Sequence, residues 1–181
     1  MRRAKNSGNA RRIDVRSRPG NPSQGILVMG NLVLHCALGK GGIRAFKREG
    51  DGATPLGPMR LLYGWRRRRS NFAPASPLSF RTIRPDDGWC DAPESRNYNR
   101  PVRLPYAQSH ERLWRDDGLY DIAIVLDWNI RPRRQGRGSA IFLHLARPGY
   151  EPTEGCIALS RADMARLLPY LTARTVIRVL H

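Results

Sequence analysis

Short apolar runs separated by loops dominate the hydrophobic pattern of the sequence. The runs are rich in Val, Ile, Leu and aromatic residues and are mostly shorter than typical helices, which favours β-strands. Two of them meet at Gly30-Asn31, a two-residue connection typical of a hairpin. In all, the pattern predicts about eight strands, at residues 13–16, 25–29, 31–38, 59–63, 78–83, 120–128, 140–145 and 175–180.

Helical periodicity stands out once, near the end of the chain. Ser160, followed three residues later by Asp163, is a typical helix start. The apolar face of this helix is formed by Met164, Leu167, Leu168 and Leu171. Ser109 suggests a cap for a second, shorter helix at residues 110–115. Many strands with one or two short helices indicate a mainly β (α+β) protein in which antiparallel pairing prevails.

The length and composition fit a single globular domain. With 181 residues, 40% of them hydrophobic, the chain is long enough to bury one core. We expect residues 1–23 to form a basic N-terminal segment that is partly flexible, and residues 24–181 to form the domain. The N-terminus lacks an apolar run of signal-peptide length, and no stretch approaches the roughly 20 apolar residues of a membrane span. A cytoplasmic protein is expected, or a periplasmic one if the N-terminus is incomplete or export is unconventional.

The charge balance is strongly basic, with a formal net charge of +17. Such a charge admits nucleic acid, an anionic membrane surface or an acidic cell-wall substrate as partners. Basic residues gather at residues 2–18 and at Arg66 to Arg69, so a nucleic-acid-binding module without catalysis is an alternative function. However, all but three of the 32 basic residues are Arg, a skew that codon bias alone can produce. The clear helix also carries an ordinary apolar face, so nucleic acid is the less favoured partner.

Three cysteines, Cys36, Cys90 and Cys156, leave an odd thiol in any pairing scheme. They show no C-x-x-C spacing, so the sequence predicts neither a disulfide framework nor a metal site, and no cofactor is expected. Free thiols fit a reducing compartment.

One of these cysteines lies close in sequence to a histidine that ends an apolar run. His144 is followed by a Pro/Gly-rich loop and then by Gly155-Cys156. If the two flanking strands pair, opposed Cβ atoms lie about 5 Å apart, and an imidazole reaches a thiol. A free thiol is only a few per cent ionised near neutral pH, and a neighbouring His activates it as a nucleophile. The alternative is a buried strand cysteine beside a core histidine, and the pair alone leaves both interpretations open.

Gly155 has a reason of its own to precede a nucleophile. Because it lacks a side chain, a carbonyl carbon can approach the sulfur of Cys156. The backbone N–H groups of Gly155 and Cys156 are candidate donors to the oxyanion that forms during acyl transfer.

Three segments together resemble the L,D-transpeptidase catalytic domain family (YkuD-like), over roughly residues 24–180. The segments are AIFLH (140–144), TEGCIAL (153–159) and, upstream, GDGATPLGPMRL (50–61), and they occur in the family's order. The resemblance implies a β-sandwich or barrel-like fold of mixed sheets. It also implies a cysteine acyltransferase or peptidase that cleaves the bond between the L-centre of a diamino acid and a terminal D-alanine in peptidoglycan stem tetrapeptides. The acyl group passes through a thioester to an amine, which gives a cross-link, or to water, which gives an L,D-carboxypeptidase.

Carried over to this sequence, the resemblance makes Cys156 the nucleophile, His144 the general base and Gly155 an oxyanion donor, with Thr153 at the family's Ser/Thr position. The loop between His and Cys is shorter than is usual in the family, and Ala158 stands where Arg or Asn is common. These departures bear on the choice between water and an amine as the acceptor.

Other residues near the motif are candidates for substrate binding. Arg137 and Arg147 flank it in sequence, and a guanidinium pairs well with a substrate carboxylate. Glu154, where the family often has His, either binds the free amine of a diamino acid or faces solvent. The polar, aromatic tract at 87–99 is a candidate wall of the cleft. The expected partners are stem peptides or released muropeptides, and a cytoplasmic location would favour hydrolysis during muropeptide recycling.

Overall fold

Strands make up most of the regular structure, which confirms the mainly β fold. The computed structural model describes residues 11–68 and 75–181. Its strands are β1 (Arg12–Arg18), β2 (Asn21–Met29), β3 (Leu32–Ala37), β4 (Ile43–Arg44), β5 (Thr54–Pro55), β6 (Gly57–Arg66), β7 (Phe80–Thr82), β8 (Asp87–Cys90), β9 (Arg100–Arg103), β10 (His110–Arg112), β11 (Ile122–Leu126), β12 (Phe142–Leu145), β13 (Ile157–Leu159) and β14 (Val176–Leu180). The helices are α1 (Arg161–Leu167) and two short 3₁₀ helices, Pro148–Tyr150 and Leu168–Tyr170.

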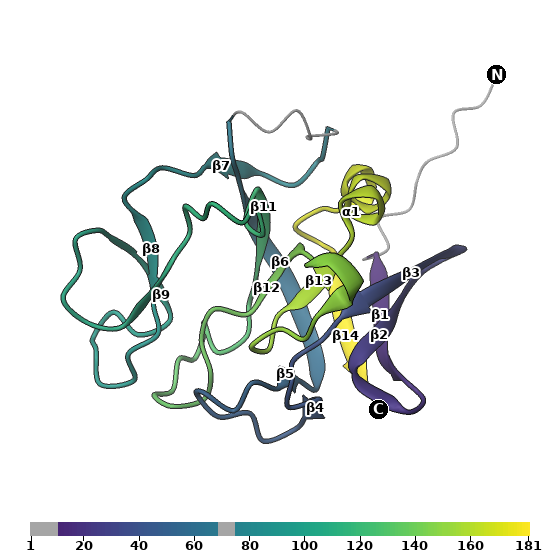
Figure 1. Ribbon diagram of the computed structural model, residues 1–181, viewed down its shortest axis with the longest axis horizontal. Helices are drawn as coiled ribbons and strands as arrows, with labels where there is room; N and C mark the ends of the chain where they lie inside the picture. Colours follow the sequence, from purple (N-terminus) through teal and green to yellow (C-terminus); the bar gives the residue numbers. More distant parts are fainter. Residues whose placement is uncertain (1–10, 69–74) are drawn as a thin grey trace.

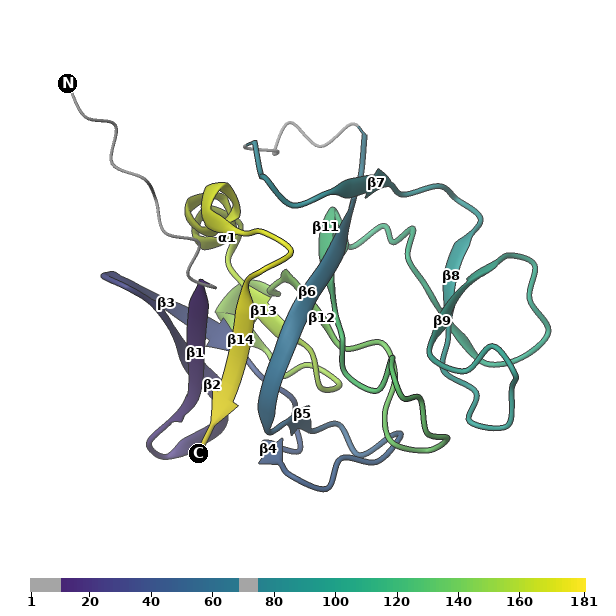
Figure 2. The ribbon, with the colours of Figure 1, turned by 180° about the vertical axis from the view of Figure 1, so that it is seen from behind.

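The largest sheet closes on itself as a barrel (Figures 1 and 2). Its strand order is β11-β12-β13-β3-β2-β1-β14-β6-β7, and β11 also pairs with β6, which completes the ring. Most neighbours are antiparallel, as predicted, but β1–β14, β6–β7 and β12–β13 are parallel. A smaller sheet of order β10-β8-β9 lies to one side of the barrel.

Alternation along β11 divides its apolar residues between two cores. On β11, Ile122 and Ile124 belong to the large core of the barrel, whereas Ala123 and Val125 belong to a second cluster. Trp89 of β8 joins this second cluster, so the smaller sheet covers part of the outer barrel surface. Both faces of β11 are therefore buried, which explains why its sequence is a continuous apolar run rather than an alternating one.

Local sequence signals correctly predicted the hairpin and the main helix. The chain turns at Gly30, whose φ of 58° suits glycine, between the antiparallel strands β2 and β3. Helix α1 begins after Ser160, whose hydroxyl accepts a hydrogen bond from the N–H of Asp163 at 3.1 Å. Both predictions are confirmed, because each depends on contacts within a few residues.

The short helix predicted at residues 110–115 is wrong. Residues His110–Arg112 form β10, which pairs antiparallel with β8, and Glu111 lies opposite Trp89. Backbone hydrogen bonds to a strand about 20 residues away satisfy the groups that a helix turn would have used, so tertiary pairing prevails over a local capping signal.

The predicted boundary between residues 23 and 24 falls inside β2. In β1, Ile13 and Val15 are fully buried, and the strand pairs with both β14 and β2. Residues 12–23 therefore belong to the folded domain. The rest of the basic arm, residues 1–10, and Arg69 of the predicted charge run lie outside the described residues. Within residues 11–68 and 75–181, no helix is long and apolar enough to cross a membrane.

Candidate active site

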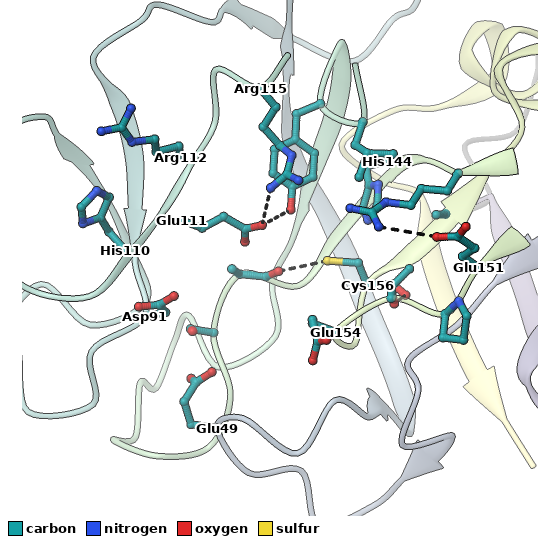
Figure 3. Close-up of a pocket in the computed structure, with 18 residues that line it drawn as sticks. Glu49, Asp91, His110, Glu111, Arg112, Arg115, His144, Glu151, Glu154 and Cys156 are labelled. Carbon is teal, nitrogen blue, oxygen red and sulfur yellow. Dashed lines mark hydrogen bonds and ion pairs between the residues drawn. The ribbon is translucent and has the colours of Figure 1, made fainter. Parts of the chain in front are cut away.

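A cavity of about 610 Å³ opens between the barrel and the smaller sheet, and both His144 and Cys156 line it (Figure 3). One wall consists of barrel residues from β12, β13 and the loop between them. The facing wall comes from β10 and the segments around it, including Glu111. The structure thus brings the predicted nucleophile and base to one site.

The register of β12 and β13 places these two residues on a common face. The strands are parallel, and His144 lies opposite Ala158. Cys156 precedes Ala158 by two residues, so it faces the same side of the sheet. The expectation that His144 and Cys156 would oppose each other directly is therefore corrected. The loop of residues 146–156 is long enough to carry the chain back to the other end of the strand, as a parallel pair requires.

His144 is held in the form of a base. Its side chain is buried, and its Nδ1 lies 2.8 Å from the carbonyl oxygen of Leu145. A carbonyl only accepts hydrogen bonds, so Nδ1 carries the proton and Nε2 has a free lone pair. The Tyr120 ring contacts the imidazole edge-on, with ring centroids 5.1 Å apart. Burial lowers the pKa of His144 to about 4, so the imidazole is neutral at physiological pH.

The thiol of Cys156 is neutral in the resting site. Its Sγ donates a hydrogen bond to the carbonyl oxygen of Ala140 at 3.2 Å and accepts one from the N–H of Phe142 at 3.3 Å. Burial and, to a smaller extent, the negative charge of Glu111 together raise the pKa of Cys156 to about 12. Sulfur and imidazole are thus both uncharged before substrate arrives.

The turn before Cys156 is braced by Thr153. The Thr153 hydroxyl donates to the carbonyl oxygen of Cys156 at 2.6 Å and accepts from the N–H of Gly155 at 3.1 Å. Backbone hydrogen bonds at each end of Thr153, to Lys40 and Leu38, fix the turn to the segment after β3. The N–H of Gly155 is engaged here, so its role as an oxyanion donor stays a prediction and requires this bond to open.

Gly155 occupies a position that strongly disfavours any side chain. Its φ is 127°, and a Cβ built on it would lie 2.7 Å from the carbonyl oxygen of Ala53. Ala53 belongs to the upstream GDGATPLGPMRL segment, so this distant motif is the backbone surface against which the Gly-Cys turn packs.

We expect Gly155→Ala to lower the free energy of unfolding by about 1–3 kcal/mol, because it adds backbone strain and a clash with a carbonyl. Acyl transfer should fall at least about tenfold, since the turn that carries Cys156 must shift. Urea denaturation and D-alanine release measure the two effects. Gly30→Ala is the matched control, because Gly30 also has a positive φ but has open space around it. Equal effects of the two substitutions on activity would contradict the packing argument.

Only some of the predicted substrate-binding residues line the Cys156 cavity. Arg147 lines the cavity, where it lies 3.5 Å from Glu151 and 3.7 Å from Asp117. Glu154 also lines the cavity, but its carboxylate is exposed and pairs with Lys40 at 2.8 Å.

Arg137 is not among the residues around Cys156. It lines a different cavity, beside Trp128, whose indole N–H donates to the Arg137 carbonyl. Of the tract at 87–99, Asp91 reaches the wall of the Cys156 cavity. Trp89 instead packs edge-on against Phe142 in the second core, so part of this tract supports the site from beneath.

Glu111, Tyr120 and Arg115 are cavity residues that the sequence did not reveal. The hydroxyl of Tyr120 donates to Glu111, and Arg115 lies 3.9 Å from the same carboxylate. Their only signal in the sequence is a polar stretch within a long, Pro-containing region, which does not single out any residue. Within the described part of the chain, no group of three His, Cys, Asp or Glu side chains is arranged to hold a metal ion.

Comparison with known proteins agrees with this geometry. The model of the YkuD family, described as the L,D-transpeptidase catalytic domain, matches residues 21–179, nearly the whole chain. No curated protein sequence matches the chain at a significant level. The match includes both strands of the site, the Gly-Cys turn and the upstream segment against which it packs. The chain therefore belongs to the YkuD family of L,D-transpeptidase catalytic domains.

Proposed function

We propose that this protein cleaves the bond between the L-centre of a diamino acid and a terminal D-alanine in peptidoglycan stem tetrapeptides, by way of a thioester on Cys156. The observation that carries the proposal is the placement of Cys156 and His144 on one face of the barrel wall, in one cavity. Membership of the family supplies the acyl-transfer chemistry on peptidoglycan peptides. The geometry suggests which atoms perform it.

In the first half of the reaction, the thiol exchanges its hydrogen bond to Ala140 for one to Nε2 of His144 and transfers its proton there. The sulfur attacks the substrate carbonyl, and the negative charge moves to the carbonyl oxygen. When this intermediate collapses, the amine of D-alanine leaves with the proton from the imidazolium. The N–H of Phe142 already points at the sulfur and stabilises the thiolate as it forms.

In the second half, the neutral imidazole of His144 takes a proton from the acceptor, which attacks the thioester carbonyl. The thiolate leaves and recovers the proton. Water as the acceptor gives a carboxypeptidase, and an amine gives a cross-link. Arg147, at the mouth of the cavity, is the proposed partner of a substrate carboxylate, which would compete with Glu151 for the guanidinium.

Incubation of the purified protein with a disaccharide tetrapeptide tests the function. We expect D-alanine to appear, and intact-protein mass spectrometry to detect the acylated enzyme. Addition of a second stem peptide as an acceptor amine separates cross-linking from hydrolysis. If neither D-alanine nor an acyl adduct forms, the proposed function is wrong. Tight binding to random duplex DNA with a steep salt dependence would then favour a nucleic-acid-binding module.

A further inference from the structure

The cavity around Cys156 is lined by more acidic than basic residues, whereas the chain as a whole is strongly basic. Acidic residues number 15 against 32 basic ones. Yet among the described residues that line the cavity, five are acidic and three are Arg. The acidic ones are Glu49, Asp91, Glu111, Glu151 and Glu154. Glu151 and Glu154 are engaged by Arg147 and Lys40, respectively.

The other three acidic side chains lie on the far side of Cys156 from Glu151 (Figure 3). Asp91 and Glu111 come from the smaller sheet and the segment that follows β8, and Glu49 comes from the segment between β4 and β5. Burial raises the pKa of Glu111, and the nearby charges of Asp91 and Asp117 contribute in the same direction. Like charges are unfavourable neighbours, so a compensating positive charge would stabilise this wall.

Unpartnered polar atoms at the same wall also point to a missing ligand. Ser139 is only 7% exposed and lines the cavity, and no donor reaches its Oγ, although the Tyr98 hydroxyl lies nearby. Asp91 Oδ1 is buried and unpartnered as well. Buried oxygen atoms without donors are rare in folded proteins, because each has given up its hydrogen bonds to water. These two oxygen atoms therefore remain without a donor, although Arg112 and Arg115 also line the cavity.

Glu111 and Glu49 are fixed in place by tyrosines. The hydroxyl of Tyr120 donates to Glu111, and that of Tyr98 donates to Glu49. Each carboxylate can accept further hydrogen bonds beyond this one. The Glu111 side chain lines the cavity and is 28% exposed. Arg115, at 3.9 Å from Glu111, is bound mainly by Asp117, so it does not neutralise the wall fully.

We propose that Asp91, Glu111 and Glu49, with the hydroxyl of Ser139, form a subsite for a primary ammonium group. An ammonium has one positive charge and three N–H donors, which match a wall with excess negative charge and free acceptors. The inference rests on the proposed function, because a diamino-acid stem peptide carries such a group. Two sources share this chemistry, namely the amine of the acyl acceptor and the side-chain amine of the acyl donor.

Two isosteric variants test the subsite, Glu111→Gln and Asp91→Asn. Each removes a negative charge and keeps an oxygen acceptor, so the hydrogen bond from Tyr120 to position 111 persists. Glu94→Gln is the matched control, because Glu94 is exposed, lies in the same region of the chain and does not line the cavity. All three variants change the net charge by the same amount.

The donor arm compares the rate of thioester formation, followed by intact-protein mass, for a tetrapeptide with a free side-chain amine and for its N-acetylated form. The acceptor arm starts from the acylated enzyme and measures the ratio of aminolysis to hydrolysis at a fixed amine concentration. We expect Glu111→Gln and Asp91→Asn to lose about tenfold or more in one arm, with the loss confined to the free amine. The arm that responds identifies the source of the ammonium group.

Two results would overturn the proposal. One is an equal loss for the free and N-acetylated compounds, which would mean that the variants only disturb the cavity. The other is no loss beyond that of Glu94→Gln in either arm. Both differ from failure of the proposed function, in which the wild-type protein forms no thioester at all and neither arm begins.

Discussion

Cys156→Ala is expected to abolish D-alanine release from a disaccharide tetrapeptide, with a loss on the order of 10³-fold or more. Covalent catalysis has no other candidate sulfur in this cavity among the described residues, because Cys36 and Cys90 do not line it. The acyl adduct seen by intact-protein mass spectrometry should disappear together with the activity. Quantification of D-alanine and of the adduct in the same samples provides the measurement.

Cys36→Ala is the matched control for this result. Cys36 is buried in the barrel core, and burial raises its pKa to about 12, as it does for Cys156. Cys36→Ala also removes a buried sulfur atom, but one that does not line the cavity. Acylation and turnover should therefore persist in this variant. Circular dichroism and urea denaturation establish that both variants remain folded. Undiminished D-alanine release from Cys156→Ala would rule out the thioester mechanism.

His144→Gln is expected to lower the acylation rate by about 10²–10⁴-fold, the range of contributions from a general base. The amide replaces part of the buried volume but cannot take the proton of Cys156. Stopped-flow release of D-alanine or the time course of adduct formation measures the loss. His35→Gln serves as the control, because His35 is exposed on β3 and does not line the cavity. Acylation at the wild-type rate in His144→Gln would exclude His144 as the base.

The same variant also tests how protonation of His144 makes the free energy of unfolding depend on pH. The pKa of His144 is about 4 in the folded protein against 6.5 for an ordinary histidine, so the unfolded chain binds more protons between these values. This group therefore favours unfolding as the pH falls from about 6.5 to about 4, by up to about 3 kcal/mol, and has no such effect above that window. His144→Gln should lack this part of the acid destabilisation. Urea titrations of both proteins at pH 7 and pH 4.5 provide the comparison, and identical pH dependence would contradict it.

The sequence predicted those features that depend on neighbouring residues. The hairpin at Gly30 and the helix start at Ser160 follow from turn and cap chemistry within a few positions. The pairing of His144 with Cys156 in one cavity was also predicted, because a short loop between two apolar runs keeps their strands close. The direction of β13 was not, since side chains alternate with the same period in parallel and antiparallel strands.

The facing wall of the cavity could not be predicted from the sequence. Its position depends on how the β8–β9–β10 sheet packs on the barrel, a long-range arrangement without a local signal. The sequence predicts a helix at Glu111, which instead lies on β10, and its contact with Tyr120 joins two segments that no spacing rule connects. Conversely, Arg137 looked favourable by its distance in sequence from the motif, but the chain carries it to another cavity.

The second apolar cluster has a consequence for how this enzyme can diversify. Cys156 belongs to this cluster, as do Ala140 and Phe142, whose backbone groups hydrogen-bond its sulfur. Trp89 of the smaller sheet packs in the same cluster, so exchange of the whole sheet would also repack the support of the nucleophile. Asp91 and Glu111 instead line the cavity. Substitutions confined to these two side chains therefore offer a route to new amine preferences that leaves the packing around Cys156 intact.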